Sequence, residues 1–414
     1  MPAAMAMLLV LSAIPVFLAC SYLFLLALLA RRRPEPAYGP PRLRFDIVVP
    51  AHDEESGVAM TVRSLLAMDY PPALRRIIVV ADNCRDRTAQ MARAAGALVV
   101  ERQSERRGKG YALEFAFERC LSDGFADAIV VVDADSAVSA NLLRAFSARL
   151  EAGATVVQAH YGVRNPAASW RTRLMAIAFS LFHKVRSLGR ERLRVSAGLR
   201  GNGMCFSSSL LREVPHRAYS LVEDVEYGIR LALAGHRVHF AYEADVLSDM
   251  VVSEQAARSQ RQRWEGGRFA MLRQYGAPLL WTGLLRSDLR LLDMAMDLFV
   301  PPLAMLAAVA GSGLVVAGLS SARAGHATLA LYLWALSNLF LVVYVVRGWR
   351  LSGTGARGLA DLLCAPVYVL WKATVLLRSS LHGRGGWVRT PREAEIAKGS
   401  PRLRLPPREA DPSK

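Results

Sequence analysis

The sequence predicts an α/β protein in which a cytoplasmic domain, built on a mostly parallel β-sheet, is flanked by transmembrane helices. Two observations indicate this fold class. Uncharged runs long enough to cross a bilayer precede and follow a central region. Inside that region, short segments rich in β-branched residues alternate with amphipathic helical segments, which is the pattern of a parallel sheet covered by helices on both faces.

The first uncharged run covers residues 1–30 and is followed at once by three arginines. A cleaved signal peptide carries its positive charge before a shorter apolar core, so we expect this run to remain as an N-terminal transmembrane helix. Positive charge marks the cytoplasmic side of a membrane, which places residue 1 outside. A linker at 31–44 then leads into a cytoplasmic domain at 45–275.

A second apolar block lies in residues 298–346, where two uncharged runs are separated by a connection too short for a domain. This block is predicted to be a transmembrane hairpin. The segment before it, 276–297, carries Asp293 and Asp297 one helical turn apart. We expect that segment to be an interfacial helix whose acids face water.

The apolar segment 359–377 is interrupted by Lys372 and is expected to be an interfacial, re-entrant or third C-terminal membrane helix. Residues 378–414 form a basic tail that is predicted to be partly disordered. The chain is expected to be a multi-pass protein of the inner (plasma) membrane, in contact with the lipid bilayer. The chain has a net charge of +17, but 53% of its residues are hydrophobic. This hydrophobic share is too high for a basic nucleic-acid-binding protein, so no nucleic acid is expected as a partner.

Polar side chains follow three of the strands predicted in the central region. The strands are expected at 45–50, 77–80, 98–100 and 128–133, and the helices between them at 54–68, 86–95 and 111–121. The polar residues are His52, Asp53 and Glu54 after the first strand, Asp82 and Asn83 after the second, and Asp133 and Asp135 after the fourth. Each can serve as a helix cap or a turn residue. Because ligands bind at the carboxyl ends of parallel strands, their convergence there predicts a site.

Asp133 and Asp135 form an i, i+2 pair of carboxylates leaving a buried strand, so both can point to the same side. Their oxygens suit Mg²⁺ or Mn²⁺. Such ions bind few protein carboxylates and complete their coordination with water and phosphate oxygens. The pair therefore predicts a substrate that contains a metal-bound diphosphate.

Lys109 lies between two glycines ahead of a predicted helix. Its loop either neutralises a phosphate or is a solvated basic turn, and it does not match the Walker A pattern. Further along, Ser220 precedes Glu223 by three residues, the spacing of a capping box. With Glu223 as the cap, Asp224 is the candidate general base that removes a proton from a sugar hydroxyl.

The segment SQRQRWEGG places Gln260, Arg263 and Trp264 on one face of a helix. Two interpretations stay open. The arginine can clamp the phosphates of a leaving group while the indole packs against a sugar ring. Alternatively, the helix lies on the bilayer, with its arginines at lipid phosphates and its tryptophan at the interface.

A series of segments in a fixed order resembles the membrane-integrated family 2 glycosyltransferases, the group that contains the cellulose, chitin, hyaluronan and poly-N-acetylglucosamine synthases. The segments are PAHDEE, VVADNCRDRT, RGKGYAL, VVVDADS, GNGMCF, VEDVEYG and QRQRW. The resemblance implies a GT-A, nucleotide-sugar-binding domain and an inverting, metal-dependent transfer from a UDP-sugar. The Q-x-x-R-W pentad is typical of the members that extend a chain.

The resemblance also implies a role for each candidate residue. Uridine would be held by Asp53, Glu54 and Asp82, the diphosphate by Lys109, Gln260 and Arg263, the Mg²⁺ or Mn²⁺ ion by Asp133 and Asp135, and the acceptor sugar by Trp264, with Asp224 as general base. Three positions depart from the family pattern, namely Asp53, Ala81 and Val222.

These features lead to two hypotheses about the acceptor. In the first, the enzyme adds a hexose or N-acetylhexosamine to a growing β-linked polysaccharide at the inner membrane, with partner proteins for export. In the second, it transfers a single sugar to a lipid or lipid-linked acceptor. A basic membrane protein without enzymatic activity is a third interpretation, but it would not need acids at the ends of several strands.

Overall fold

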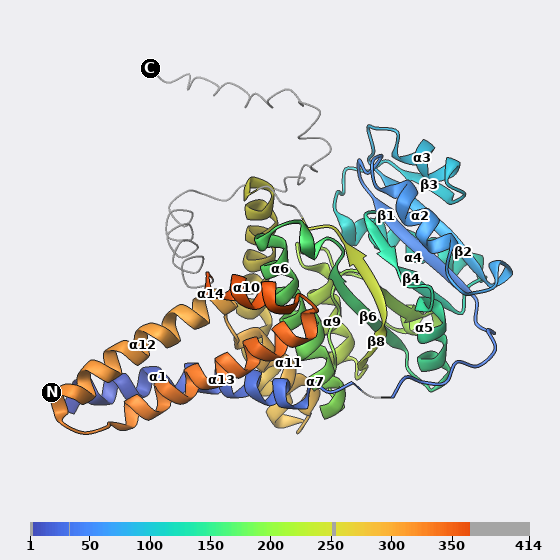
Figure 1. Ribbon diagram of the computed structural model, residues 1–414. Helices are drawn as coiled ribbons and strands as arrows, with labels where there is room; N and C mark the ends of the chain where they lie inside the picture. Colours follow the sequence, from blue (N-terminus) through green and yellow to red (C-terminus); the bar gives the residue numbers. More distant parts are fainter. Residues whose placement is uncertain (1–2, 33, 251–253, 365–414) are drawn as a thin grey trace, which may run out of the picture.

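The computed structural model describes residues 3–32, 34–250 and 254–364, with the backbone alone at residue 3 and at 254–263. Within these residues, an eight-stranded sheet carries helices on both faces, and long helices extend away from it to one side (Figure 1). The strands are β1 (Phe45–Ala51), β2 (Arg75–Asp82), β3 (Leu98–Arg102), β4 (Ala128–Val131), β5 (Ser136–Val138), β6 (Val156–Val163), β7 (Met204–Ser207) and β8 (Val238–Ser248).

The helices follow the same numbering as Figure 1. Those before the last strand are α1 (Ala3–Leu29), α2 (Val58–Leu66), α3 (Thr88–Ala94), α4 (Lys109–Asp123), α5 (Leu142–Glu151), α6 (Trp170–Phe179), the π-helix η3 (Ser180–Val185), α7 (Arg186–Leu193), α8 (Ser208–Glu213) and α9 (Glu223–Leu233). Those after it are α10 (Glu254–Leu285), α11 (Leu289–Phe299), α12 (Leu303–Ala324), α13 (Leu329–Ser352) and α14 (Gly355–Leu363). Single 3-10 turns, η1 (Pro72–Leu74) and η2 (Pro166–Ala168), complete the assignment.

The sheet is mixed, with the strand order β3-β2-β1-β4-β7-β6-β8-β5. β1 to β4 run parallel to one another, whereas β7 is antiparallel to both of its neighbours and β5 is antiparallel to β8. The predicted α/β class is confirmed, and the parallel half is the part that the strand and helix alternation predicted. The chain enters β7 through Gly201 and Gly203, which both have positive φ, a backbone conformation that glycine adopts without strain.

The strands of the parallel half are buried on both faces. Ile47 and Val49 of β1 belong to one core with α2 and α5, and Val48 belongs to a second core with α4 and α9. This two-sided burial explains why the predicted strands are uninterrupted apolar runs. The helix expected at 54–68 begins later, at Val58, because the loop after β1 passes through Asp53 with a φ of 53°.

Three helices are long and apolar enough to cross a membrane: Ala4–Leu29 of α1, and the whole of α12 and α13. They pack together along much of their length (Figure 1). A Cβ atom at Gly313 of α12 would lie 2.4 Å from the Trp334 ring of α13, so the glycine allows close approach of the two helices. The Trp334 indole in turn donates a hydrogen bond to the carbonyl of Leu9 in α1.

The expectation that Asp293 and Asp297 face water is wrong. Both carboxylates are buried on α11, where Asp297 forms ion pairs with Arg186 at 2.7 Å and with Arg190 at 2.8 Å, and Asp293 pairs with Arg190 at 3.0 Å. The arginines come from α7, more than a hundred residues earlier, so their approach is not visible in the local sequence. The segment expected as one interfacial helix at 276–297 consists of the end of α10, a turn and α11.

The C-terminal part of the chain is only partly covered by the described residues. The start of segment 359–377 is the last part of α14, which an ion pair of 2.5 Å between Arg173 and Asp361 holds against α6. The remainder of that segment, and the tail 378–414, lie outside the described residues.

We predict that Asp297→Asn destabilises the protein by about 3–5 kcal/mol, the usual cost of breaking a buried ion pair, because it leaves the buried guanidinium groups without their shared counter-ion. The unfolding midpoint of the detergent-solubilised protein is the measurement. Asp69→Asn is the matched control, since Asp69 is exposed and pairs with Arg144 at the surface. Equal midpoints for the two variants would contradict a structural role for the buried carboxylate.

Candidate active site

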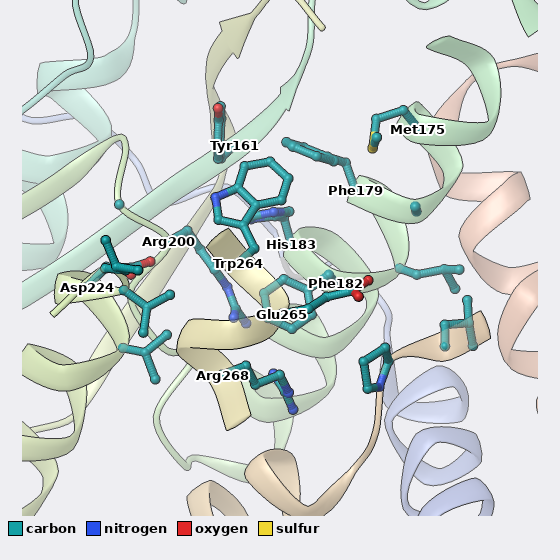
Figure 2. Close-up of a pocket in the computed structure, with 18 of the residues that line it drawn as sticks. Tyr161, Met175, Phe179, Phe182, His183, Arg200, Asp224, Trp264, Glu265 and Arg268 are labelled. Carbon is teal, nitrogen blue, oxygen red and sulfur yellow. The ribbon is translucent and has the colours of Figure 1, made fainter. Parts of the chain in front are cut away.

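A cavity of about 1040 Å³ opens beyond the carboxyl ends of β1 and β4 and extends to α12 and α13. Figure 2 shows part of its lining, with Asp224 and Met175 on opposite sides. The polar end of the cavity is lined by Glu54, Lys109, Asp133, Asp135 and Asp224. The structure therefore brings the predicted metal pair, the basic loop and the proposed base into one cavity, although they come from three different parts of the chain.

Lys109 and Asp133 form the centre of the polar end. The Lys109 ammonium lies 2.5 Å from the Asp133 carboxylate and 2.5 Å from the carbonyl of Gly201, and Glu223 is 3.7 Å away. Burial alone lowers the pKa of Lys109, but Asp133 and Glu223 outweigh it, so the pKa is raised above its usual value. Lys109 is thus a fixed positive charge at the start of α4.

Asp135 accepts hydrogen bonds from the hydroxyls of Ser136, at 3.3 Å, and Ser248, at 3.5 Å. The backbone N–H of Asp133 donates to the side chain of Asn202 at 3.0 Å, which fixes the turn between the two acids. Both carboxylates line the same cavity. Their hard oxygen donors, with room for substrate oxygens beside them, fit the coordination that Mg²⁺ and Mn²⁺ prefer.

The expected capping box at Ser220 and Glu223 is wrong. Glu223 is the first residue of α9 rather than the third, so its carboxylate cannot reach back to the cap. The backbone N–H groups of Tyr219 and Ser220 donate instead to Glu226, at 3.1 and 3.0 Å. Glu223 is therefore available to face Lys109.

Asp224 follows directly and is buried in the wall of the cavity. Burial raises its pKa, while Lys109 and Arg200 oppose that increase. A Cβ atom at Gly201, which has a φ of +75°, would lie 3.5 Å from a carboxylate oxygen of Asp224. The absence of a side chain at Gly201 thus keeps space beside the proposed base.

The residues that the resemblance assigns to uridine occupy neighbouring strand ends, but only Glu54 among them lines the cavity. Asp82 is buried and pairs with Arg102 at 2.5 Å. The carboxylate of Asp53 accepts from the backbone of Arg85 at 2.7 Å. The first contact joins the ends of β2 and β3, and the second orders the loops after β1 and β2 against one another.

A group of Asp53, Cys84 and Asp86 also has ligand atoms within 4.8 Å of one another. Its members already stabilise these loops, since Asp86 accepts from the backbone of Glu55 and Cys84 accepts from the backbone of Asp53. We therefore regard it as part of the loop structure.

Aromatic side chains form the next part of the wall. The ring centre of Trp264, on α10, lies 6.0 Å from that of Phe179. The Phe179 ring centre in turn lies 4.7 Å from that of His183 and 5.3 Å from that of Tyr161 (Figure 2). The π-helix η3 carries His183 together with Phe182 at the cavity, a placement typical of functional π-bulges. The positions of the Trp264 partners were not predicted from the sequence.

Gln260 and Arg263 precede Trp264 on the same helix, but their side chains lie outside the described residues. Arg200 is a further cavity residue that the sequence analysis missed. The available signal was a cationic residue directly before the glycines of GNGMCF.

The far end of the cavity is apolar. It is lined by Leu174 and Met175 of α6, Leu303 and Ala307 of α12, and Leu341 and Val345 of α13. Since α12 and α13 are candidate membrane spans, the cavity extends from the acidic end to two of these candidate spans.

A sequence model described as glycosyltransferase-like family 2 matches residues 40–267, more than half of the chain. The chain belongs to glycosyltransferase family 2. The expected enzyme class is thereby confirmed, and the matched range contains every candidate site residue from Asp53 to Trp264.

The family 2 chain is similar to two curated relatives. It is 27% identical over 252 residues to a beta-monoglucosyldiacylglycerol synthase of Synechocystis, covering 56% of this chain and 51% of the relative. It is 25% identical over 243 residues to the probable glycosyltransferase YdaM of Bacillus subtilis, covering 56% of each. The chain thus spans about half the length of the curated relatives it matches.

Among solved structures, a mannosyltransferase from Pyrobaculum calidifontis in complex with GDP-Man and Mn²⁺ has a similar fold. The TM-score is 0.52, the sequence identity 15%, and the match covers 82% of this chain and 98% of the mannosyltransferase. The GT-A fold implied by the sequence is therefore confirmed.

Adjacent glycines on α10 provide a test of how Asp224 is positioned. A Cβ atom at Gly267 would lie 2.6 Å from a methyl group of Val222, the residue before Glu223, whereas one at Gly266 meets nothing within 4 Å. We predict that Gly267→Ala displaces the start of α9, with an overpacking cost of about 1–3 kcal/mol. It should reduce the transfer rate about tenfold or more.

Gly266→Ala makes the same chemical change one residue away and should leave the rate and the unfolding midpoint unchanged or slightly improved, because alanine favours a helix. Turnover and thermal unfolding of the two variants are the measurements. Identical behaviour would show that the contact between α10 and Val222 does not position the base.

Proposed function

We propose that this chain transfers a hexose or N-acetylhexosamine from a UDP-sugar, with inversion and with Mg²⁺ or Mn²⁺, to a hydroxyl of a lipid or lipid-linked acceptor. The observation that carries the choice of acceptor is the continuity of the cavity. One end holds carboxylates and Lys109, and the other is an apolar wall on α6, α12 and α13. A lipid has this combination of a polar head and apolar chains, and one relative is named a beta-monoglucosyldiacylglycerol synthase, which supports the choice.

The chemistry follows from the polar end of the cavity. Asp224 takes the proton of the acceptor hydroxyl as its oxygen attacks the anomeric carbon, and the bond from that carbon to the UDP oxygen breaks on the opposite side. This displacement inverts the configuration. The pKa of Asp224 is raised by burial, which brings it nearer to the pKa of an effective general base at neutral pH.

The other candidates bind the donor. Asp133 and Asp135 hold the divalent cation, which neutralises charge on the diphosphate when it is bound. Lys109 lies beside Asp133, where it can bind a phosphate oxygen as the leaving group acquires charge. We assign Glu54, with Asp53 and Asp82, to the uridine, Gln260 and Arg263 to the diphosphate, and Trp264 to the acceptor.

We further propose a multi-pass location in the inner membrane with the catalytic domain in the cytoplasm. Arg347, near the end of α13, donates a hydrogen bond to the carbonyl of Ala30, just after α1. The positive charges that follow α1 and those at the end of α13 are therefore at the same end of the helix bundle, next to the catalytic domain. This distribution agrees with the positive-inside rule.

Extension of a β-linked polysaccharide, as in the cellulose and chitin synthase group, is the second candidate. The observation in its favour is the Q-x-x-R-W pentad at Gln260, Arg263 and Trp264. Buried residues of all three candidate spans pack against one another, so this alternative would require partner proteins to provide an export path.

Replacing a metal-binding carboxylate tests the donor chemistry. We predict that Asp133→Asn or Asp135→Asn abolishes UDP release from a UDP-sugar, as does a chelator, because the charge of the diphosphate is then no longer balanced. The assay uses UDP-glucose, UDP-N-acetylglucosamine and UDP-galactose with Mg²⁺ or Mn²⁺. Undiminished UDP release in the chelator would exclude the proposed metal dependence.

The apolar end of the cavity allows a test of the acceptor. We predict that Ala307→Trp fills this end and lowers transfer to long-chain lipids about tenfold or more, since overpacking costs about 1–3 kcal/mol. UDP release by donor hydrolysis should be unaffected. Val309→Trp is the matched control, because Val309 is 41% exposed on the same helix and does not line the cavity.

The product is identified by thin-layer separation after incubation with radiolabelled UDP-sugars and a mixed membrane lipid extract. One labelled lipid band is the expected result. A ladder of oligomers, formed equally well by Ala307→Trp, would support the polysaccharide alternative instead.

A further inference from the structure

Three guanidinium groups surround one phenyl ring in the middle of the cavity. The guanidinium carbons of Arg200, Arg186 and Arg268 lie 4.3, 5.0 and 5.7 Å from the centre of the Phe182 ring. All four residues line the cavity, and Figure 2 shows Arg200 and Arg268 near Phe182, below Trp264. This concentration of positive charge lies between Asp224 and the apolar end.

The carboxylates of α11 neutralise only part of this charge. Asp297 pairs with Arg186 and Arg190 and lies 3.7 Å from Arg268, while Asp293 pairs with Arg190. Arg200 has no carboxylate within ion-pairing distance among the described residues. It is the one member of the group that forms no close ion pair in that part of the chain, and Asp297 and Asp224 act on its charge only from a greater distance.

The hydrogen bonds of Arg200 are also incomplete. One Nη donates to the carbonyl of Ala197 at 3.0 Å and to the hydroxyl of Ser187 at 3.4 Å. The residue is only 7% exposed to solvent. Its Nε is buried and has no hydrogen-bond partner among the described residues. A buried donor without an acceptor and a buried guanidinium without a paired carboxylate are both costly, which indicates that a ligand completes the site.

Burial and the neighbouring Arg190 lower the pKa of Arg200 to about 9. Arg200 is therefore still a cation at neutral pH, and its ligand should be an anion. A planar guanidinium matches the oxygens of a phosphate.

The place of the site within the cavity identifies which substrate supplies this anion. The donor diphosphate is assigned to the end that holds Lys109, Asp133 and Asp135. Arg200 and Arg268 instead lie over the Phe182 ring, and Arg268 also donates to the carbonyl of Val300, shortly before α12. An anion bound there would belong to a molecule whose hydroxyl reaches Asp224 and whose chains occupy the apolar end.

We propose that Arg200, supported by Arg268, binds the phosphate of the acceptor, so that the acceptor is a phosphate-bearing lipid with a free hydroxyl rather than a neutral lipid. The inference rests on the proposed function and narrows its substrate class. The phosphate is bound and unchanged. The lipid hydroxyl forms the new bond to the anomeric carbon, its proton goes to Asp224, and UDP leaves.

The test measures binding to the full chain in phosphate-free maltoside micelles. The probes are dioctanoyl-phosphatidylglycerol, dioctanoylglycerol, which has the same acyl chains and a hydroxyl but no phosphate, and inorganic phosphate. We expect the phosphatidylglycerol to raise the unfolding midpoint and to bind at least about tenfold more tightly than dioctanoylglycerol, as a charge-assisted hydrogen bond to a buried guanidinium would give. Equal binding of the two lipids would overturn the proposal.

The variant Arg200→Met should lose the preference for phosphatidylglycerol, and Arg200→Lys should keep part of it. Arg192→Met is the matched control, because Arg192 is exposed on α7 and does not line the cavity. If Arg200→Met does not fold, the comparison of dioctanoyl-phosphatidylglycerol with dioctanoylglycerol on the native chain still decides whether the phosphate is recognised. Stabilisation by inorganic phosphate as strong as that by the lipid would assign the site to a soluble anion and overturn the lipid assignment.

The failure of this inference can be told from the failure of the proposed function. Efficient transfer of sugar to dioctanoylglycerol would overturn the phosphate site and leave lipid glycosylation intact. UDP release accompanied by a polymer ladder, with neither lipid glycosylated, would overturn the proposed function itself.

Discussion

The shared burial of Asp297 among arginines from two helices is the interaction on which the arrangement of this protein depends. Arg186 and Arg190 of α7 bind the carboxylate directly, and Arg268 of α10 lies 3.7 Å from it. Arg186 also donates to the hydroxyl of Tyr344 in α13, and Arg190 donates to the hydroxyl of Tyr22 in α1. Burial alone would raise the pKa of Asp297, but the surrounding guanidinium groups lower it, so the acid stays charged. One carboxylate thereby joins the catalytic domain to two candidate membrane spans.

This junction explains how the catalytic sheet and the bundle of candidate membrane spans share one cavity. The parallel strands bring acids to one edge because their carboxyl ends coincide, and η3 continues directly into α7, whose arginines are fixed by α11. The aromatic and cationic wall is thus held between the two parts of the protein. A displacement of α7 would change the distance between the acidic end and the apolar end.

The sequence predicts the strand ends well and the connections between distant helices poorly. Asp133 and Asp135 could be placed because a buried strand precedes them and the strand period is local. Glu223 was misassigned because the capping pattern does not reveal where α9 begins, and Glu226 satisfies the same backbone groups. The burial of Asp297 and the place of Arg200 in the cavity were both missed, since the residues that surround them come from far away in the chain. Amphipathic periodicity does not distinguish an acid in water from one buried against an arginine.

The apolar wall formed by α6, α12 and α13 has a kinetic consequence. Under the proposed function, the lipid acceptor reaches the cavity along these helices, so it diffuses in two dimensions within the leaflet and is never dissolved in water. Its effective concentration is then a mole fraction of the surrounding lipid, so added inert lipid slows the encounter even when the total amount of acceptor is constant. Membrane composition would therefore set the rate of this enzyme as directly as the supply of its soluble substrate.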